Sequence, residues 1–254
     1  VASDLPEKVE QVLDVELLPR HRAVYDRLLA RERARVLGLV ENLDGHRFEV
    51  LRSLTVLRQA ALDVSLVGAD DPATTATPPG GTSRPVPSSK LEVLFEMLED
   101  ILAEGHSVLI FSQFTQFLGR VRDGLEARSV AHSYLDGRTR RRQEQIDAFT
   151  RGETQVFLIS LKAGGFGLNL TAADYCILLD PWWNPAAEAQ AVDRAHRIGQ
   201  TKQVMVYRMV ASDTIEEKVM RLKEGKSALF SSVLDGGAAG GAGLSAADVR
   251  ELLS

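Results

Sequence analysis

The sequence predicts an α/β fold, in which a parallel sheet carries helices on both faces and is preceded by a mainly helical connector. From residue 108 to residue 210, short apolar runs recur between longer amphipathic stretches. Apolar runs without alternation are typical of strands buried on both sides, and the helical stretches between them supply the connections that parallel strands require. The chain before residue 69 shows helical periodicity instead.

The first 68 residues are predicted to form the connector. Apolar and acidic side chains alternate over residues 13–17, as in an exposed strand, and Pro19 opens a helical stretch to about residue 43. A second helix is expected over residues 48–62. Residues 69–89 are rich in Pro, Gly and Thr and cannot bury enough apolar surface to order themselves, so they are predicted to be a flexible linker.

Residues 90–235 are predicted to form the α/β lobe. Asp213 and Glu216 have the spacing of a capping box, which predicts a closing helix to about residue 229. Residues 236–254 are predicted to be a glycine-rich tether and a short helix capped by Ser245. The expected strands cover residues 108–111, 134–135, 156–159, 175–179 and 204–210, and the expected helices cover residues 91–103, 114–127, 139–150 and 187–198.

Composition bounds the possible classes of protein. The chain has 254 residues, 44% of them apolar, which is enough for one or two globular cores. A single cysteine, Cys176, excludes an intrachain disulfide, and the cysteine and histidine spacing suggests no metal site. No apolar run is long enough for a membrane span, so no membrane partner and a cytoplasmic location are expected. The chain lacks an initiating Met, which suggests a piece of a longer protein.

The stretch around residues 190–200 is the most informative part of the chain. If it is helical, Gln190, Asp193, Arg194 and Arg197 fall on one side and small apolar residues fall on the other. Guanidinium groups bind phosphate in a bidentate manner and can meet the charge that develops on a transferring phosphoryl group. We therefore predict arginine fingers at Arg194 and Arg197, although a solvated face of ion pairs is as common a use of such a pattern.

Polar and basic clusters follow the predicted strands. Ser112 and Gln113 follow the first apolar strand, Gly137 and Arg138 stand in a turn before a basic helix, and Ser160 and Lys162 follow a third strand. Hydroxyl groups, backbone amides, arginines and helix N-termini suit phosphate oxygens. Each cluster taken alone is equally well read as a polar cap or a solvated patch.

Two further segments continue this order. The glycine-rich loop that carries Gly165, Gly167 and Asn169 lets the backbone approach a ligand closely. Trp182 and Trp183 stand between prolines just before the arginine stretch, and at least one of them is expected to be exposed.

The chain also lacks parts of a phosphate site. Residues 225–227 read Gly-Lys-Ser, but Met220 replaces the first glycine of a P-loop and a helix precedes the segment instead of a strand. No Asp-Glu dipeptide occurs, so the carboxylate pair that commonly holds magnesium and activates water is missing. Phosphate-facing arginines without a phosphate cradle indicate half of a site, completed by another domain.

These motifs, in this order, resemble those of the second RecA-like lobe of Swi/Snf-type ATPases, superfamily-two helicase-like proteins. The resemblance covers residues 88–230, and it carries the motifs Ser112-Gln-Phe-Thr, Leu135-Asp-Gly, Ser160-Leu-Lys-Ala-Gly-Gly-Phe-Gly-Leu-Asn-Leu, Trp183-Asn-Pro and Gln190-Ala-Val-Asp-Arg-Ala-His-Arg-Ile-Gly-Gln. It implies a RecA-like sheet and a motor that hydrolyses ATP between two lobes and moves along double-stranded DNA. ATP and Mg²⁺ would be held mainly by an N-terminal RecA-like lobe that this chain lacks, so the chain alone would be inactive.

The resemblance also implies roles for individual residues. Arg194 and Arg197 would be catalytic arginine fingers, and the helix after Asp213 would be a brace across both lobes. The resemblance further implies a monomer, associated with a nucleoid or located in a nucleus. The residues expected at the nucleotide are Gln190, Asp193, Gly165, Gly167 and Asn169, and those expected at the DNA backbone are Ser112, Gln113, Gly137, Arg138, Ser160, Lys162 and Trp183. Two departures, Asp63-Val-Ser and the low-complexity linker, put local loop geometry in doubt.

Three other functions fit parts of the pattern. An RNA or single-strand helicase lobe is disfavoured by Trp183-Asn-Pro and by His196-Arg-Ile-Gly. A noncatalytic binding module is disfavoured by the intact Gln190, Arg194 and Arg197. A sugar-nucleotide transferase has little use for paired arginine fingers. The physiological task, whether remodelling nucleoprotein, recycling polymerase or repair, does not follow from the sequence.

Overall fold

The computed structural model describes residues 5–43, 45–68, 85–162, 168–181, 185–223 and 245–254. It divides into two compact units, each built from two stretches of chain. The first contains residues Val1–Leu13 and Val93–Val210, and the second contains residues Asp14–Glu92 and Ala211–Ser254. Among the described helices, none is long and apolar enough to cross a membrane.

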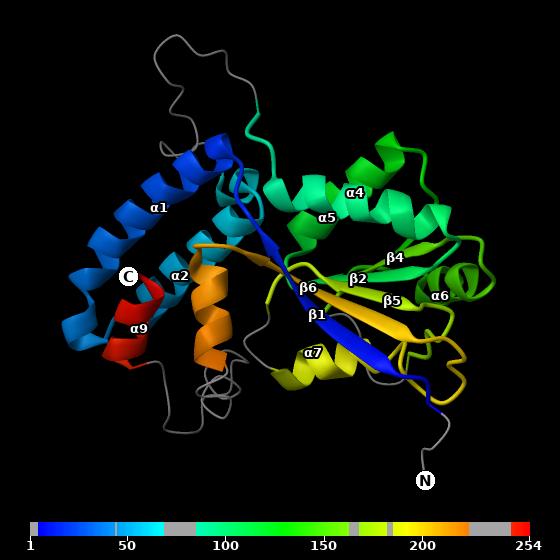
Figure 1. Ribbon diagram of the computed structural model, residues 1–254. Helices are drawn as coiled ribbons and strands as arrows, with labels where there is room; N and C mark the ends of the chain where they lie inside the picture. The colour runs from blue at the N-terminus through cyan, green and yellow to red at the C-terminus, as the bar shows by residue number, and fades with distance from the viewer. Residues whose placement is uncertain (1–4, 44, 69–84, 163–167, 182–184, 224–244) are drawn as a thin grey trace. The chain divides into compact units, whose positions relative to one another are not determined.

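The first unit is built on a six-stranded sheet in the order β1-β6-β5-β2-β4-β3 (Figure 1). The pairs β2–β4, β2–β5, β3–β4 and β5–β6 are parallel. The backbone bonds of Val204 to Glu7 and of Ser212 to Val15 show that β1 also runs parallel to β6. The strands are β1 (Lys8–Val15), β2 (Val108–Ser112), β3 (His132–Leu135), β4 (Val156–Ser160), β5 (Tyr175–Leu178) and β6 (Val204–Ala211). The predicted parallel α/β fold is confirmed.

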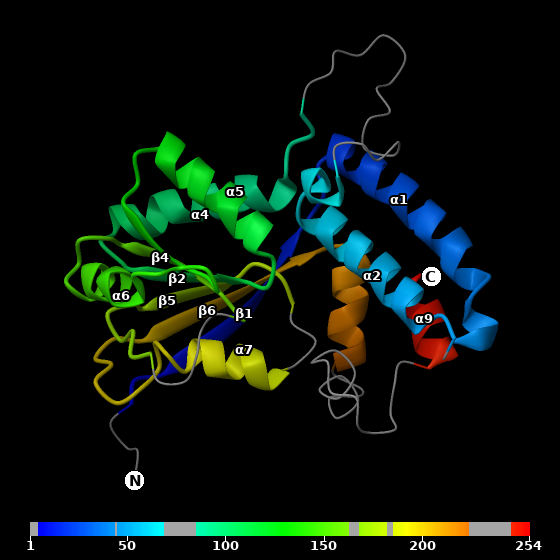
Figure 2. The ribbon, with the colours of Figure 1, turned by 180° about the vertical axis from the view of Figure 1, so that it is seen from behind.

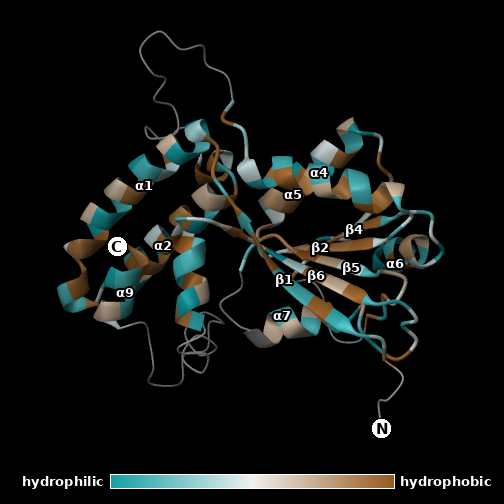
Figure 3. Ribbon diagram, in the orientation of Figure 1, coloured by the Kyte–Doolittle hydropathy of each residue, from teal (hydrophilic) through white to brown (hydrophobic). Residues whose placement is uncertain are grey.

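Helices cover both faces of this sheet. In both ribbon views α4 and α5 lie on one face and α7 lies on the other (Figures 1 and 2). One buried cluster joins Phe149 of α6 and Ala191 of α7 to side chains of the strands, which places α6 on the α7 side. Figure 3 shows the central strands as the apolar part of the sheet, because they are buried from both sides. These helices are α4 (Ser89–Ala103), α5 (Thr115–Ala127), α6 (Arg142–Thr150) and α7 (Pro185–Val192).

The second unit is mainly helical. Its elements are α1 (Pro19–Leu37), η1 (Val40–Asn42), α2 (Arg47–Leu62), η2 (Val64–Val67), a helical stretch at residues 215–223 and α9 (Ala246–Leu252). A fully buried ion pair, 2.6 Å between Lys90 Nζ and Glu216 Oε2, joins the start of α4 to the stretch that follows β6. Ser245 caps α9, as predicted, and forms a capping box with Asp248.

Several boundaries differ from the prediction. The helix that begins at Pro19 ends at Leu37, and only a short 3₁₀ turn follows before residue 43. The strand expected at residues 13–17 begins earlier, at Lys8. The cap of the helix after β6 is Thr214, whose hydroxyl oxygen accepts from the Glu216 amide at 3.1 Å, whereas Asp213 has a positive φ of 53°. The Glu216 carboxylate is engaged instead by the Ala211 amide and Lys90.

Candidate nucleotide and nucleic-acid interfaces

The carboxyl ends of β2 and β4 bring Ser112 and Ser160 side by side as paired residues. The Ser112 hydroxyl donates to Asp180 Oδ1 at 2.5 Å, and the Gln113 amide donates to the same carboxylate at 3.3 Å. Both serine side chains are buried, so in this structure Ser112 faces Asp180 and not solvent. The side chain of Ser112 therefore positions the turn that carries Gln113, whereas Lys162, in the turn after β4, is exposed.

The basic turn lies at the same edge, because β3 pairs with β4. Asp136 Oδ1 accepts from the Arg138 amide at 2.8 Å and from the Thr139 hydroxyl at 3.0 Å. Burial alone would raise the pKa of Asp136, but these donors outweigh it and hold the pKa below its ordinary value. The carboxylate thus fixes a turn that leaves Gly137 and Arg138 exposed beside the basic start of α6.

The arginine stretch is not one helix, which corrects the prediction. Helix α7 ends at Val192, and both arginines lie in the turns that follow. Two carbonyls that a continuing helix would use are already engaged. The Leu170 amide donates to the Arg194 carbonyl at 2.9 Å, and Gln200 Nε2 donates to the Ala195 carbonyl at 3.0 Å.

Gln200 holds this turn with its whole side chain. Its amide nitrogen also donates to the Ala173 carbonyl at 2.8 Å, and its amide oxygen accepts from the Thr201 and Lys202 amides, each at 3.0 Å. The side chain is buried, so its donors and acceptor are matched within the protein. This role of Gln200 could not be predicted from the sequence, because neither spacing nor composition shows which backbone groups a side chain will meet.

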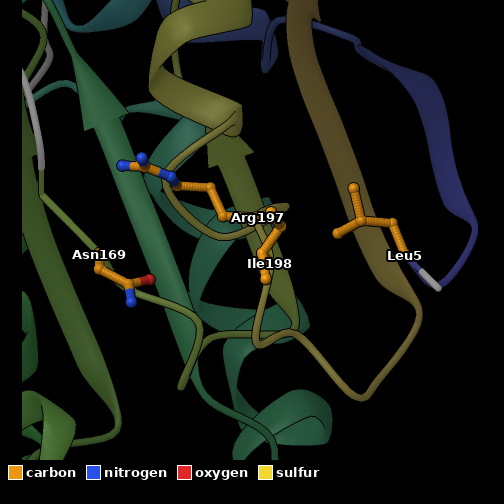
Figure 4. Close-up of a pocket in the computed structure, with 4 residues that line it drawn as sticks. All are labelled: Leu5, Asn169, Arg197 and Ile198. Carbon is orange, nitrogen blue, oxygen red and sulfur yellow. The ribbon is translucent and has the colours of Figure 1, made fainter. Parts of the chain in front are cut away.

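The two arginines have different surroundings. Arg194 is only 5% exposed, its guanidinium carbon lies 5.9 Å from the centre of the Phe111 ring, and burial lowers its pKa. Arg197 is exposed and lines a cavity of about 400 Å³ with Leu5, Asn169 and Ile198 (Figure 4). The predicted pairing of the two guanidiniums on one helix face is therefore not found, and only Arg197 meets solvent.

The structure brings together some of the predicted nucleotide residues. Asn169 and Arg197 share the cavity, while Gln190 and Asp193 are exposed at the end of α7 and just after it. Gly165, Gly167 and Trp183 lie outside the described residues, so their predicted contacts stay predictions.

The cavity and the basic turn lie at different ends of the sheet. Ala173, which bonds to Gln200, comes just before β5, and Arg197 comes before β6, whereas Ser112 and Arg138 come just after β2 and β3. Because all of these strands are parallel, the arginine turn lies towards the amino ends and the polar turns lie at the carboxyl ends.

The segment before β1 contacts the turn that carries Arg197 and the start of β6. His196 Nε2 donates to the Pro6 carbonyl at 2.8 Å, and the Val204 amide donates to the Glu7 carbonyl at 3.1 Å. Leu5 is thereby held against the cavity. No motif in the sequence signals this contact, because it joins residues about 190 positions apart.

In the described part of the chain, no three His, Cys, Asp or Glu side chains gather in a way that could hold a metal ion. The Cys176 thiol is buried, and burial raises its pKa to about 12, so it is unreactive near neutral pH.

Comparison with known proteins supports the family resemblance. Residues 89–199 match the model of the helicase conserved C-terminal domain. The chain is 45% identical over 157 residues to the chromatin-remodeling ATPase INO80 of Aspergillus oryzae and 43% identical over 162 residues to that of Mus musculus. These alignments cover 61% and 63% of the chain, but only 11% and 10% of the two relatives. The chain thus spans about a tenth of the length of the curated relatives it matches.

Solved structures extend the likeness over nearly the whole chain. The Sulfolobus solfataricus SWI2/SNF2 ATPase C-terminal domain has 26% identity and a TM-score of 0.67, with 98% of this chain and 100% of that chain covered. The core of the same ATPase in complex with double-stranded DNA has 28% identity and a TM-score of 0.70, with 99% of this chain and 51% of that chain covered. The fold, the motif order and these matches agree, and the chain is similar to the C-terminal RecA-like lobes of the Swi/Snf-type family.

Proposed function

We propose that this chain is the C-terminal motor lobe of an ATP-dependent double-stranded DNA translocase similar to chromatin remodellers. The observation that carries the proposal is the exposed Arg197, which lines a cavity with Asn169 and stands in a turn whose Arg194 and Ala195 carbonyls are held by Leu170 and Gln200. A cation carried by such a turn can meet charge on a transferring phosphoryl group.

The nucleotide would be shared between two lobes. ATP and Mg²⁺ are held mainly by an N-terminal RecA-like lobe, and this chain adds Arg197 as the arginine finger, with Gln190, Asp193 and Asn169 at its side. Arg194 is buried and packs on Phe111, so its proposed role is to stabilise the turn that carries Arg197. The glycines at 165 and 167 would bring the backbone of their loop close to the nucleotide.

Duplex DNA would lie at the carboxyl ends of the strands. Gly137, Arg138 and Lys162 are exposed there, and Gln113 is positioned by Asp180. Contacts of these groups with one phosphate backbone would give affinity without sequence preference. The buried Ser112 and Ser160 would position the residues of this surface. Trp183 would link the DNA-binding surface to the nucleotide site. The structure of a related core with double-stranded DNA favours a duplex over a single strand as the partner.

The protein is proposed to work as a monomer. The expected cytoplasmic location has no support, because the curated relatives are named for chromatin. We place the protein with DNA, in a nucleoid or a nucleus.

An ATPase assay tests the proposal. The isolated chain should hydrolyse no ATP above background, whereas the chain joined to its N-terminal lobe should show turnover stimulated by duplex DNA. In the two-lobe protein, Arg197→Ala should lower kcat by at least about 100-fold, as expected when a charge-stabilising donor is removed. Arg250→Ala, which removes an exposed arginine on α9, serves as the control. Turnover by the isolated chain that Arg197→Ala abolishes would contradict the two-lobe site.

A further inference from the structure

The cavity at Arg197 contains more than a phosphate contact. Its four lining residues supply a guanidinium, a carboxamide and two aliphatic side chains. In Figure 4 the guanidinium of Arg197 points away from Leu5, Ile198 lies between them, and Asn169 lies on the guanidinium side. The cavity therefore has a polar end and an apolar end.

Hydrogen bonds of the neighbouring residues hold Leu5 at the apolar end. Leu5 is held there by the bonds of Pro6 to His196 and of Glu7 to Val204, and Gln203 Nε2 adds a bond of 3.3 Å to the Glu7 carboxylate. Ile198 is 88% exposed although it stands in a turn that Gln200 fixes. An isolated exposed aliphatic residue needs no explanation, but one that lines a cavity beside a guanidinium suits a ligand with both charged and apolar parts.

A nucleotide has this distribution of chemistry. Its terminal phosphate is anionic and can accept hydrogen bonds from a guanidinium and a carboxamide, and its base has apolar faces that pack on aliphatic side chains. A volume of about 400 Å³ falls in the range of small-molecule sites and can receive the side of a nucleotide turned away from another lobe.

We propose that this cavity takes the nucleotide lengthwise, with the terminal phosphate at the polar end, beside Arg197 and Asn169, and the base at the apolar end, against Ile198 and Leu5. The inference deepens the proposed function and rests on it. It assigns to this lobe a share in binding the nucleoside, and it makes the segment before β1 part of the site.

Steady-state kinetics of the two-lobe protein test the inference. Leu5→Ser and Ile198→Ser should each raise KM for ATP about tenfold, the size expected when one aliphatic contact is lost, and should change kcat much less. Serine is used because an acidic residue would also repel the phosphates. Ile198→Leu, which keeps an aliphatic side chain at this position, should have the KM of the parent protein. Val12→Ser, which removes another exposed aliphatic side chain, 53% exposed on β1 and absent from the cavity lining, should leave both constants unchanged.

Inhibition by inorganic tripolyphosphate tests the polar end of the cavity independently of the apolar end, because this compound has the phosphates and lacks the nucleoside. Its inhibition constant should stay the same in Leu5→Ser and Ile198→Ser and should rise in Arg197→Ala. If the parent protein is active but neither serine substitution changes its KM for ATP, this inference alone is overturned. The same holds if the inhibition constant of tripolyphosphate rises together with KM in the two serine variants. A parent without DNA-stimulated turnover would remove both proposals.

Discussion

His21 is a buried histidine that joins three segments of the helical unit. Its Nε2 donates to the Ala60 carbonyl at 2.7 Å, and its Nδ1 accepts from the Ser89 amide at 3.2 Å and lies 2.9 Å from the Ser89 hydroxyl oxygen. The same hydroxyl oxygen accepts from the Leu18 amide at 2.8 Å. Only the neutral ring with its proton on Nε2 satisfies these bonds.

This arrangement predicts a pH dependence of stability. Burial, the largest cause, lowers the pKa of His21, although the Ala60 bond opposes the shift. Because the folded protein disfavours the charged ring, the contribution of His21 to stability is full above the unfolded pKa of about 6.5 and is lost as pH falls below it. Urea unfolding at pH 8 and at pH 5.5 should show this loss, and His21→Gln should show a smaller difference between the two pH values. An equal difference in both proteins would assign the effect to other groups.

At the scale of elements, helices α4 and α5 depend on a glycine for their contact. A Cβ built at Gly124 of α5 would overlap the ring of Phe95 in α4, whereas a Cβ at Gly119 in the same helix meets nothing within 4 Å. The Arg128 guanidinium also lies over the Phe95 ring, 4.0 Å from its centre, so the ring has little freedom to move aside. The close approach is thus specific to one of two glycines that the sequence alone does not distinguish.

Two alanine substitutions test this contact. Gly124→Ala should lower the free energy of unfolding by about 1–3 kcal/mol, because overpacking forces the helices apart or the ring off its rotamer. Gly119→Ala should be neutral or stabilising by up to about 1 kcal/mol, because alanine has the higher helix propensity. Chemical unfolding of both variants gives the comparison. A destabilisation of the same size at both positions would show that the helix contact is not the cause.

At the scale of the whole molecule, the parts that could be predicted from the sequence are those set by local patterns. Buried strands, amphipathic helices and the Ser245 cap depend on neighbouring residues, so their residue types reveal them. The end of α7 could not be predicted, because Leu170 and Gln200 bind the Arg194 and Ala195 carbonyls, which a longer helix would have used. The burial of Arg194 and the placing of Leu5 likewise depend on contacts between distant segments, which a periodic pattern does not record.

The charge of the whole chain gives the last prediction. Its net charge is −5, so DNA binding must depend on local clusters and not on the total. Each arginine that neutralises a phosphate adds about one to the slope of the logarithm of affinity against the logarithm of salt concentration. In the two-lobe protein, Arg138→Ala should therefore weaken duplex binding at low salt and reduce the slope by about one, equally for different sequences. Arg151→Ala, which removes an exposed arginine paired with Glu153 at the other end of α6, should leave the slope unchanged. Equal slopes in the parent and Arg138→Ala would place the DNA away from the basic turn.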